Sequence, residues 1–180
     1  MMTLASQCGL HHYLRMKLTT DNIIPYKKDK RSLLDYALVP IAGAPLFLSV
    51  DVVTTLLEFG ADPNDKCGGE WTPWQNALSY IHVTAPTLSP DIQVAALHLW
   101  ASVIEHLLQA GADPNTGCLE PARFRMMGRH RIVGDQLCPA REVITKTFDS
   151  HLQLQTELGR IMTLMDQKRK QHKRSSCRPQ

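Results

Sequence analysis

The feature that most constrains this chain is a segment of thirteen residues that occurs twice. The first copy, VVTTLLEFGADPN, runs from Val52 to Asn64, and the second, VIEHLLQAGADPN, runs from Val103 to Asn115. In both copies apolar residues lie at positions i, i+1, i+4 and i+5, which is typical of a helix with one buried face. A unit that recurs in this way must bury its apolar face against a neighbouring unit. The sequence therefore predicts stacked helical units.

The end of each copy predicts how its helix stops. Gly60 and Gly111 can adopt the left-handed backbone conformation that is common just after a helix. The following Asp-Pro-Asn is turn chemistry, because proline cannot continue a helix and the Asp side chain accepts hydrogen bonds from its own turn. Asp62 and Asp113 belong to equivalent turns of successive units. We therefore interpret them as turn residues and not as a catalytic carboxylate pair.

These copies resemble the ankyrin repeat, whose second helix and turn read V-V-x-L-L-L-x-x-G-A-D-x-N. The first helix of that family opens with T-P-L-H-x-A, and here T-P-W-Q-N-A runs from Thr72 to Ala77. A looser version, S-L-L-D-Y-A, begins at Ser32. The resemblance implies an all-α fold, an ankyrin-repeat solenoid of helix-turn-helix units with short hairpin-like turns. It would hold about two clear repeats, degenerate terminal repeats and C-terminal capping helices. In the family the Thr closes a hydrogen bond at the start of the first helix, while Gln75 replaces the usual His.

The resemblance also divides the chain into segments. Residues 1–136 form the ankyrin-repeat region, residues 137–167 two capping helices, and residues 168–180 a disordered basic tail. The repeat region consists of a partial repeat 1–28, a repeat 29–65, a repeat 66–116 with an inter-helix insertion, and a loop 117–136. Since the first repeat is incomplete, we expect the chain to be the C-terminal part of a longer ankyrin protein. More narrowly, it resembles the ankyrin regions of fungal NACHT/STAND-type signalling proteins.

The insertion follows from the spacing of the two copies. Gly60 and Gly111 are 51 residues apart, whereas an ankyrin repeat has a period of about 33. Ser89-Pro90-Asp91 predicts the start of a long helix, with an N-cap, a proline in the first turn and an acidic residue near the positive end. Residues 82–88 are predicted to be loop. The expected buried face of the long helix consists of Ile92, Ala96, Leu99, Val103 and Leu107.

Cysteine usage and hydropathy bear on the compartment. The five cysteines are scattered, odd in number and without a C-x-x-C pair, so we expect reduced thiols in an intracellular protein. The N-terminus lacks the basic and apolar regions of a signal peptide. Of the two long stretches without charged residues, 36–50 is too short to span a membrane and 71–90 is too polar. We expect a cytoplasmic protein, with the nucleus as the alternative.

Motifs that carry chemistry are absent from the sequence. It contains no P-loop, dinucleotide-binding, nucleophile-elbow or H-E-x-x-H pattern. Cys8, His11 and His12 lie close together, but a zinc site needs about four ligands and no others have a recognisable spacing. We therefore expect no catalytic, cofactor-binding or metal-binding residues, and a protein that is not an enzyme.

The resemblance implies a binding role instead. Ankyrin stacks bind other proteins through a concave face made by hairpin tips and first helices. In this chain the expected partner-binding residues are Asp65, Lys66, Glu70, Trp71, Gln75, Ser79 and Tyr80. Trp71, beside the tip, is either an exposed interface anchor or a packing residue. We expect a monomeric, non-catalytic protein–protein interaction module whose partner the sequence does not identify.

A second interpretation depends on the basic tail. Six of the 20 basic residues lie in residues 168–180, which contain no acidic residue, so the rest of the chain has 14 basic and 17 acidic residues. The run from Lys168 to Arg174 matches a nuclear-localisation or nucleic-acid-binding patch. It is also what a solvated helix end looks like, since cations stabilise the negative pole of a helix. The alternative function is therefore binding of nucleic acid or of a nuclear-transport factor through this tail.

Overall fold

The computed structural model describes residues 2–7, 10–21, 27–28, 31–39, 48–66, 71–119 and 137–176. Over these ranges the protein is mostly helical, as the repeat pattern predicts. It divides into two compact units, unit 1 from Met1 to Ala77 and unit 2 from Leu78 to Gln180. Each unit is described by itself.

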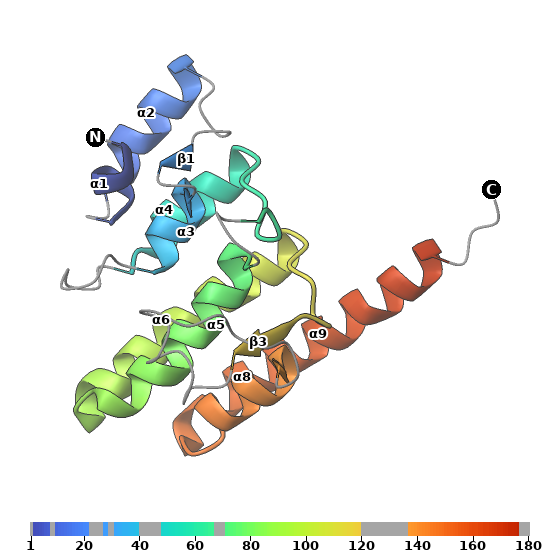
Figure 1. The fold of residues 1–180 in the computed structure, drawn as a ribbon. Helices are drawn as coiled ribbons and strands as arrows, with labels where there is room; N and C mark the ends of the chain where they lie inside the picture. The colour runs from blue at the N-terminus through green and yellow to red at the C-terminus, as the bar shows by residue number, and fades with distance from the viewer. Residues whose placement is uncertain are drawn as a thin grey trace. The chain divides into compact units, whose positions relative to one another are not determined.

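Unit 1 contains two pairs of helices joined by a short β-hairpin (Figure 1). The helices are α1 (Met2–Gln7), α2 (His11–Asp21), α3 (Leu33–Leu38) and α4 (Val50–Glu58). The first helix of one pair, α1, packs on the first helix of the next, α3, and α2 packs on α4 in the same way. Between the pairs, β1 (Lys27–Lys28) and β2 (Arg31–Ser32) run antiparallel. Each pair thus buries its apolar face against the other pair, as an internal repeat requires.

Serine side chains set the starts of two of these helices. The Asp35 backbone N–H donates to Ser32 Oγ at 3.2 Å at the start of α3, and the Val52 N–H donates to Ser49 Oγ at 3.4 Å at the start of α4. Such caps satisfy backbone donors that have no partner within the helix. The apolar residues that follow are buried, among them Leu34, Leu38, Val52, Val53 and Leu56.

A buried carboxylate holds the parts of unit 1 together. Asp35 in α3 is only 1% exposed, and it pairs with the guanidinium of Arg31 in β2. The Asn76 side-chain amide donates to Asp35 Oδ1 at 2.9 Å, which connects α3 to the start of α5. Arg31 also donates to the Val39 carbonyl at 2.7 Å and lies over the Tyr36 ring, 4.3 Å from its centre. The charge is therefore compensated by hydrogen bonds from two other segments.

Unit 2 contains the remaining helices and a second hairpin. Its elements are α5 (Pro73–Thr84, from Leu78 onward), η1 (Ala85–Thr87), α6 (Pro90–Gln109), β3 (Gly117–Leu119), β4 (Leu137–Pro139), α8 (Ala140–Phe148), η2 (Leu152–Leu154) and α9 (Gln155–Ser176). α6 packs along α9, α9 packs on α8, and the β3–β4 hairpin lies against α8. Side-chain contacts connect α6 with α9: His98 Nδ1 lies 3.3 Å from the Glu157 carboxylate, and Arg160 pairs with Glu105 at 3.1 Å.

Three segments of unit 2 differ from the sequence predictions. Residues 82–88 are helical almost throughout, because Pro86 occupies the first turn of η1, where its missing N–H is no loss. Residues 117–119 were predicted as loop but form β3, which pairs with β4. A local sequence pattern does not indicate this pairing, because the two strands are far apart in the chain. The rest of the predicted loop, residues 120–136, lies outside the described residues. The basic tail is helical up to Ser176, and Lys168 Nζ donates to the Gln109 carbonyl at 3.2 Å.

The buried face of α6 also differs from the expected one. Val103 and Leu107 are buried as predicted, but Ile92 is 59% exposed and Leu99 is 46% exposed. The first buried residue of α6 is Leu97; before it, Gln93, Val94 and Ala96 are half-buried and the other residues are exposed. The residues that α6 buries are Leu97, Trp100, Ala101, Val103, Ile104, Leu107 and Leu108.

The two repeated turns have the same geometry, which confirms the predicted role of their glycines. Gly60 has a φ of +90° and Gly111 a φ of +99°. After the first, the Ala61 N–H donates to the Leu56 carbonyl at 2.9 Å, and the Asn64 N–H donates to Asp62 Oδ1 at 2.8 Å. The second turn repeats both bonds at 2.9 Å, with Ala112, Leu107, Asn115 and Asp113 as the equivalent residues. Asp62 and Asp113 are thus turn residues, each within its own unit.

Gly111 and Gly159 provide a matched pair of substitutions in unit 2. A Cβ at either position would meet nothing within 4 Å, so only the backbone conformation distinguishes them. We expect Gly111→Ala to lower the free energy of unfolding by about 1–2 kcal/mol, because of its left-handed conformation. Gly159→Ala, inside α9, should raise it by about 0.5–1 kcal/mol. Urea unfolding followed by circular dichroism measures both, and a shift of the two variants in the same direction would contradict this assignment.

Candidate interaction surface

The turn that ends the first repeat lies beside the β1–β2 hairpin. Lys27 Nζ in β1 is 2.7 Å from Asp65 Oδ2, and it also donates to the Lys66 backbone carbonyl at 3.3 Å. Both side chains of the ion pair are partly exposed, and Lys66 is exposed. The hairpin and the turn therefore present their side chains on one surface of unit 1.

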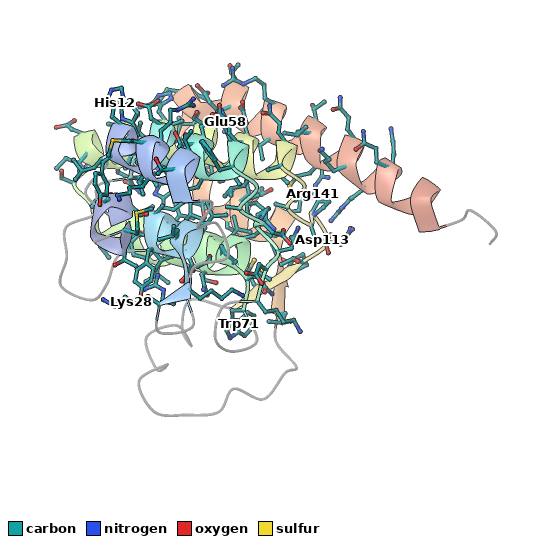
Figure 2. The ribbon with its side chains drawn as sticks, turned by 90° about the horizontal axis from the view of Figure 1, so that it is seen from above. His12, Lys28, Glu58, Trp71, Asp113 and Arg141 are labelled. Carbon is teal, nitrogen blue, oxygen red and sulfur yellow. The ribbon has the colours of Figure 1, made fainter. Side chains whose placement is uncertain are left out.

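Within unit 1, Trp71 and Lys28 lie at one edge in the view of Figure 2, opposite the edge that carries His12 and Glu58. The Trp71 side chain is half-buried, so part of the indole packs and part faces solvent. We name the surface formed by this edge and the adjoining turn the tip surface; it consists of Lys27, Lys28, Asp65, Lys66 and Trp71. Glu70, which the sequence also placed here, lies outside the described residues.

Gln75 has a structural role at the start of α5. The Gln75 backbone N–H donates to Thr72 Oγ1 at 3.2 Å, and the Thr72 N–H donates to Gln75 Oε1 at 2.9 Å. This reciprocal arrangement is a capping box, which satisfies two backbone donors at the helix start. It confirms the prediction that Thr72 closes a hydrogen bond at the start of this helix.

The two expected binding residues in unit 2 are less available. Ser79 is only 3% exposed and does not reach the surface, which corrects the prediction. Its neighbours Leu78 and Ile81 are buried as well, so α5 is covered on more than one face at this point. Tyr80 is half-buried, with its ring centre 6.2 Å from that of Trp100, and burial raises the pKa of its hydroxyl.

A polar contact between α5 and α8 was not predicted from the sequence. His82 Nδ1 is 2.8 Å from Thr147 Oγ1, and the Thr147 hydroxyl donates to the Val143 carbonyl at 2.7 Å. Since the hydroxyl hydrogen is used there, the imidazole Nδ1–H donates to Thr147. Burial, followed by the nearby charge of Lys146, holds the pKa of His82 below its usual value. The partner of His82 is 65 residues away, so no local motif signals the contact.

His82 should make the stability of the protein depend on pH. Its pKa is lower in the folded state than the usual value of 6.5, so the unfolded chain binds the proton more readily. The stabilisation is present above about pH 6.5 and is lost as the pH falls below that value towards the folded-state pKa. We expect urea midpoints to drop less between pH 7.5 and pH 5 for His82→Gln than for the wild type. Equal drops in the two proteins would contradict this role of His82.

Two hollows lie near these elements. In unit 1 a hollow of about 180 Å³ is lined by the start of α3 and by the first repeated turn, including Asp65 of the tip surface. In unit 2 an open groove of about 560 Å³ runs between α6 and α9, with Glu105 and Arg160 on its walls. Turn residues line part of the first hollow, and mostly polar helix side chains line the second, whereas small-molecule sites are usually concave and mainly apolar.

Neither metal-binding nor membrane-spanning features occur in the described part of the chain. Within those ranges no three His, Cys, Asp or Glu side chains lie close enough together to hold a metal ion. His11 and His12 stack with ring centres 3.8 Å apart, while Cys8 lies outside the described ranges. Of the helices that the structure describes, none is both long enough and apolar enough to cross a bilayer.

The structure defines a mostly helical protein, in which one helix pair of unit 1 packs on the other. The chain matches no protein-family model, no curated protein and no solved structure.

Proposed function

We propose that this chain is a non-catalytic, ankyrin-type protein-interaction module that binds a partner protein through the tip surface. The observation that supports this proposal is the repeated geometry of the two turns, in which a left-handed glycine and an Asx turn follow a helix that buries three equivalent positions: Val52 and Val103, Val53 and Ile104, and Leu56 and Leu107. After the first of these turns Asp65 is half-buried and Lys66 is exposed, so this segment offers charged side chains to solvent.

The chemistry of the tip surface suits a protein partner. Trp71 offers a half-buried indole, and aromatic anchors of this kind dominate the energetics of many interfaces. Lys28 and Lys66 are exposed, and the Lys27–Asp65 ion pair is partly exposed. Protein interfaces commonly combine aromatic anchors with charged and polar side chains at the rim.

The remaining parts of the proposal follow from the same class of protein. We propose that the module acts as a monomer inside the cell, in the cytoplasm or the nucleus, without a cofactor. Neither hollow contains a nucleophile held by a base, and this supports a binding role over a catalytic one.

The test is capture of a partner by the full chain and by matched surface variants. We expect Trp71→Ala and Lys66→Glu each to weaken capture of one defined protein by tenfold or more, in line with a hot-spot loss of about 1.4 kcal/mol or greater. The control is Leu152→Ala, since Leu152 is 87% exposed and belongs to unit 2. Equal capture by all variants, with unchanged circular dichroism, would contradict binding at the tip surface.

The same experiment tests the alternative that the basic tail binds nucleic acid. Two of the tail cations are engaged by the fold, since Lys168 and Arg169 donate to the Gln109 and Pro114 carbonyls. A nucleic-acid role predicts capture that nuclease abolishes, that weakens steeply with salt and that the triple variant Lys170→Gln, Lys173→Gln, Arg174→Gln loses. The tip-surface proposal predicts that nuclease and the triple variant leave capture unchanged.

A further inference from the structure

The β3–β4 hairpin brings two cysteines opposite each other. The strands run antiparallel with Cys118 directly across from Cys138. Directly opposed residues of an antiparallel pair have Cα atoms about 4.5 or 5.5 Å apart, depending on the type of pair. Both values lie in the range of about 4.4–6.8 Å that disulfides span. The strands also approach closely beside this pair, since a Cβ at Gly117 would lie 2.7 Å from the Leu137 Cβ.

The two thiols are reduced in this structure and differ in their access to solvent. Cys118 is fully buried, and burial together with neighbouring Cys138 raises the pKa of its thiol to about 12. Cys138 is half-buried, and its thiol donates a hydrogen bond to the Glu142 carboxylate in the first turn of α8. Glu142 is in turn 2.7 Å from Lys146 Nζ. A small reagent in solution can therefore reach the Cys138 thiol directly, whereas the Cys118 thiol is not accessible to it.

We propose that Cys118 and Cys138 form a reversible disulfide across the hairpin, with a low-molecular-weight disulfide such as glutathione disulfide as the oxidant. The site is a redox modification site, and it does not depend on the proposed binding function. Opposed thiols in a register fixed by backbone pairing need only rotate their side chains and shift the strands slightly to meet. Strained or accessible disulfides of this kind are the readily reduced ones.

The reaction is two successive thiol–disulfide exchanges. The Cys138 thiolate attacks one sulfur of glutathione disulfide, forming a mixed disulfide and releasing one glutathione thiolate, which takes up the proton that Cys138 lost. The Cys118 thiol then loses its proton to solvent, and its sulfur attacks Cys138 Sγ and displaces the second glutathione, which is protonated in turn. In total the two protein thiols are oxidised to one disulfide, and one glutathione disulfide is reduced to two glutathione molecules.

The burial of Cys118 makes the rate of ring closure depend strongly on pH. Its thiol has a pKa of about 12, so between pH 7 and pH 9 the reactive thiolate fraction grows about tenfold for each unit of pH. We expect the rate of closure from the mixed disulfide to rise with the same slope. A closure rate that does not change over this range would show that Cys118 is not the attacking thiol.

The experiment uses the full chain with Cys8→Ser, Cys67→Ser and Cys177→Ser, so that only this pair remains, and the wild type in parallel for peptide mapping. After incubation with glutathione disulfide, acid quenching and alkylation, intact mass spectrometry should show the loss of two hydrogen atoms. Mapping should yield one cross-linked peptide containing Cys118 and Cys138. Excess reduced glutathione should reverse both changes.

Two variants separate closure of the pair from general thiol reactivity. Cys118→Ser should retain glutathione on Cys138, because no second thiol displaces it. In the variant Leu137→Cys with Cys138→Ser, the thiol moves by one residue to the other face of β4, so it should accept glutathione but not close on Cys118. The proposal is overturned if the intact pair stays reduced, or keeps a stable glutathione adduct, under conditions that fully modify this shifted thiol.

Discussion

Asp35→Ala is expected to lower the free energy of unfolding by about 3–5 kcal/mol, which is the usual effect of breaking a buried ion pair. Asp35 is 1% exposed, and its carboxylate serves both the Arg31 guanidinium and the Asn76 side-chain amide. Alanine would leave a charged donor and a neutral donor without their acceptor in a poorly solvated place. Equilibrium urea unfolding followed by circular dichroism measures the effect.

A second ion pair of unit 1 serves as the matched control for Asp35. Arg15 and Glu58 are 2.5 Å apart, but both side chains are more than half exposed. Glu58→Ala should therefore change the stability by less than about 1 kcal/mol. Equal losses for Asp35→Ala and Glu58→Ala would mean that burial does not govern the strength of these pairs. Asp35→Asn, which keeps an acceptor oxygen of similar shape, should lose less than Asp35→Ala.

The second large effect is expected at Trp100. Trp100→Ala should lower the free energy of unfolding by about 3–5 kcal/mol, because it removes a large buried side chain and leaves a cavity. The residue is 2% exposed in α6, and its ring lies beside that of Tyr80. The adjacent Leu99 is 46% exposed, so Leu99→Ala should remain within about 0.5 kcal/mol of the wild type. If Leu99→Ala costs as much as Trp100→Ala, the face of α6 assigned as buried is wrong.

Features that depend on nearby residues were predictable from the sequence. The left-handed glycines, the Asx turns at Asp62 and Asp113, the Ser49 cap and the start of α6 at Pro90 all involve partners within about one helical turn. Such signals use the chemistry of a few adjacent residues, so they can be read without knowledge of the fold. The mostly helical class followed from them.

Features that depend on distant residues were not predictable in this way. The pairing of β3 with β4 joins strands that are far apart in sequence. The sequence therefore did not indicate that Cys118 lies opposite Cys138. The exposure of Leu99 and the burial of Ser79 depend on which neighbours cover each helix, which periodicity alone does not specify. The sequence indicated several residues of the tip surface, but the participation of Lys27 and Lys28 became visible only with the hairpin in place.

The exposed residues at the start of α6 have a practical consequence. The repeated turn lies at the C-terminal end of this helix, while Asp91 and Ile92 at its N-terminal end are exposed and follow the exposed residues Pro86 and Thr87 of η1. Lengthening the connection between η1 and α6 costs little stability, because the entropic cost of closing a loop grows only with the logarithm of the loop length. The η1–α6 junction is thus a suitable place to insert a fluorescent reporter or an affinity tag, far along the helix from the turn that shapes the repeat.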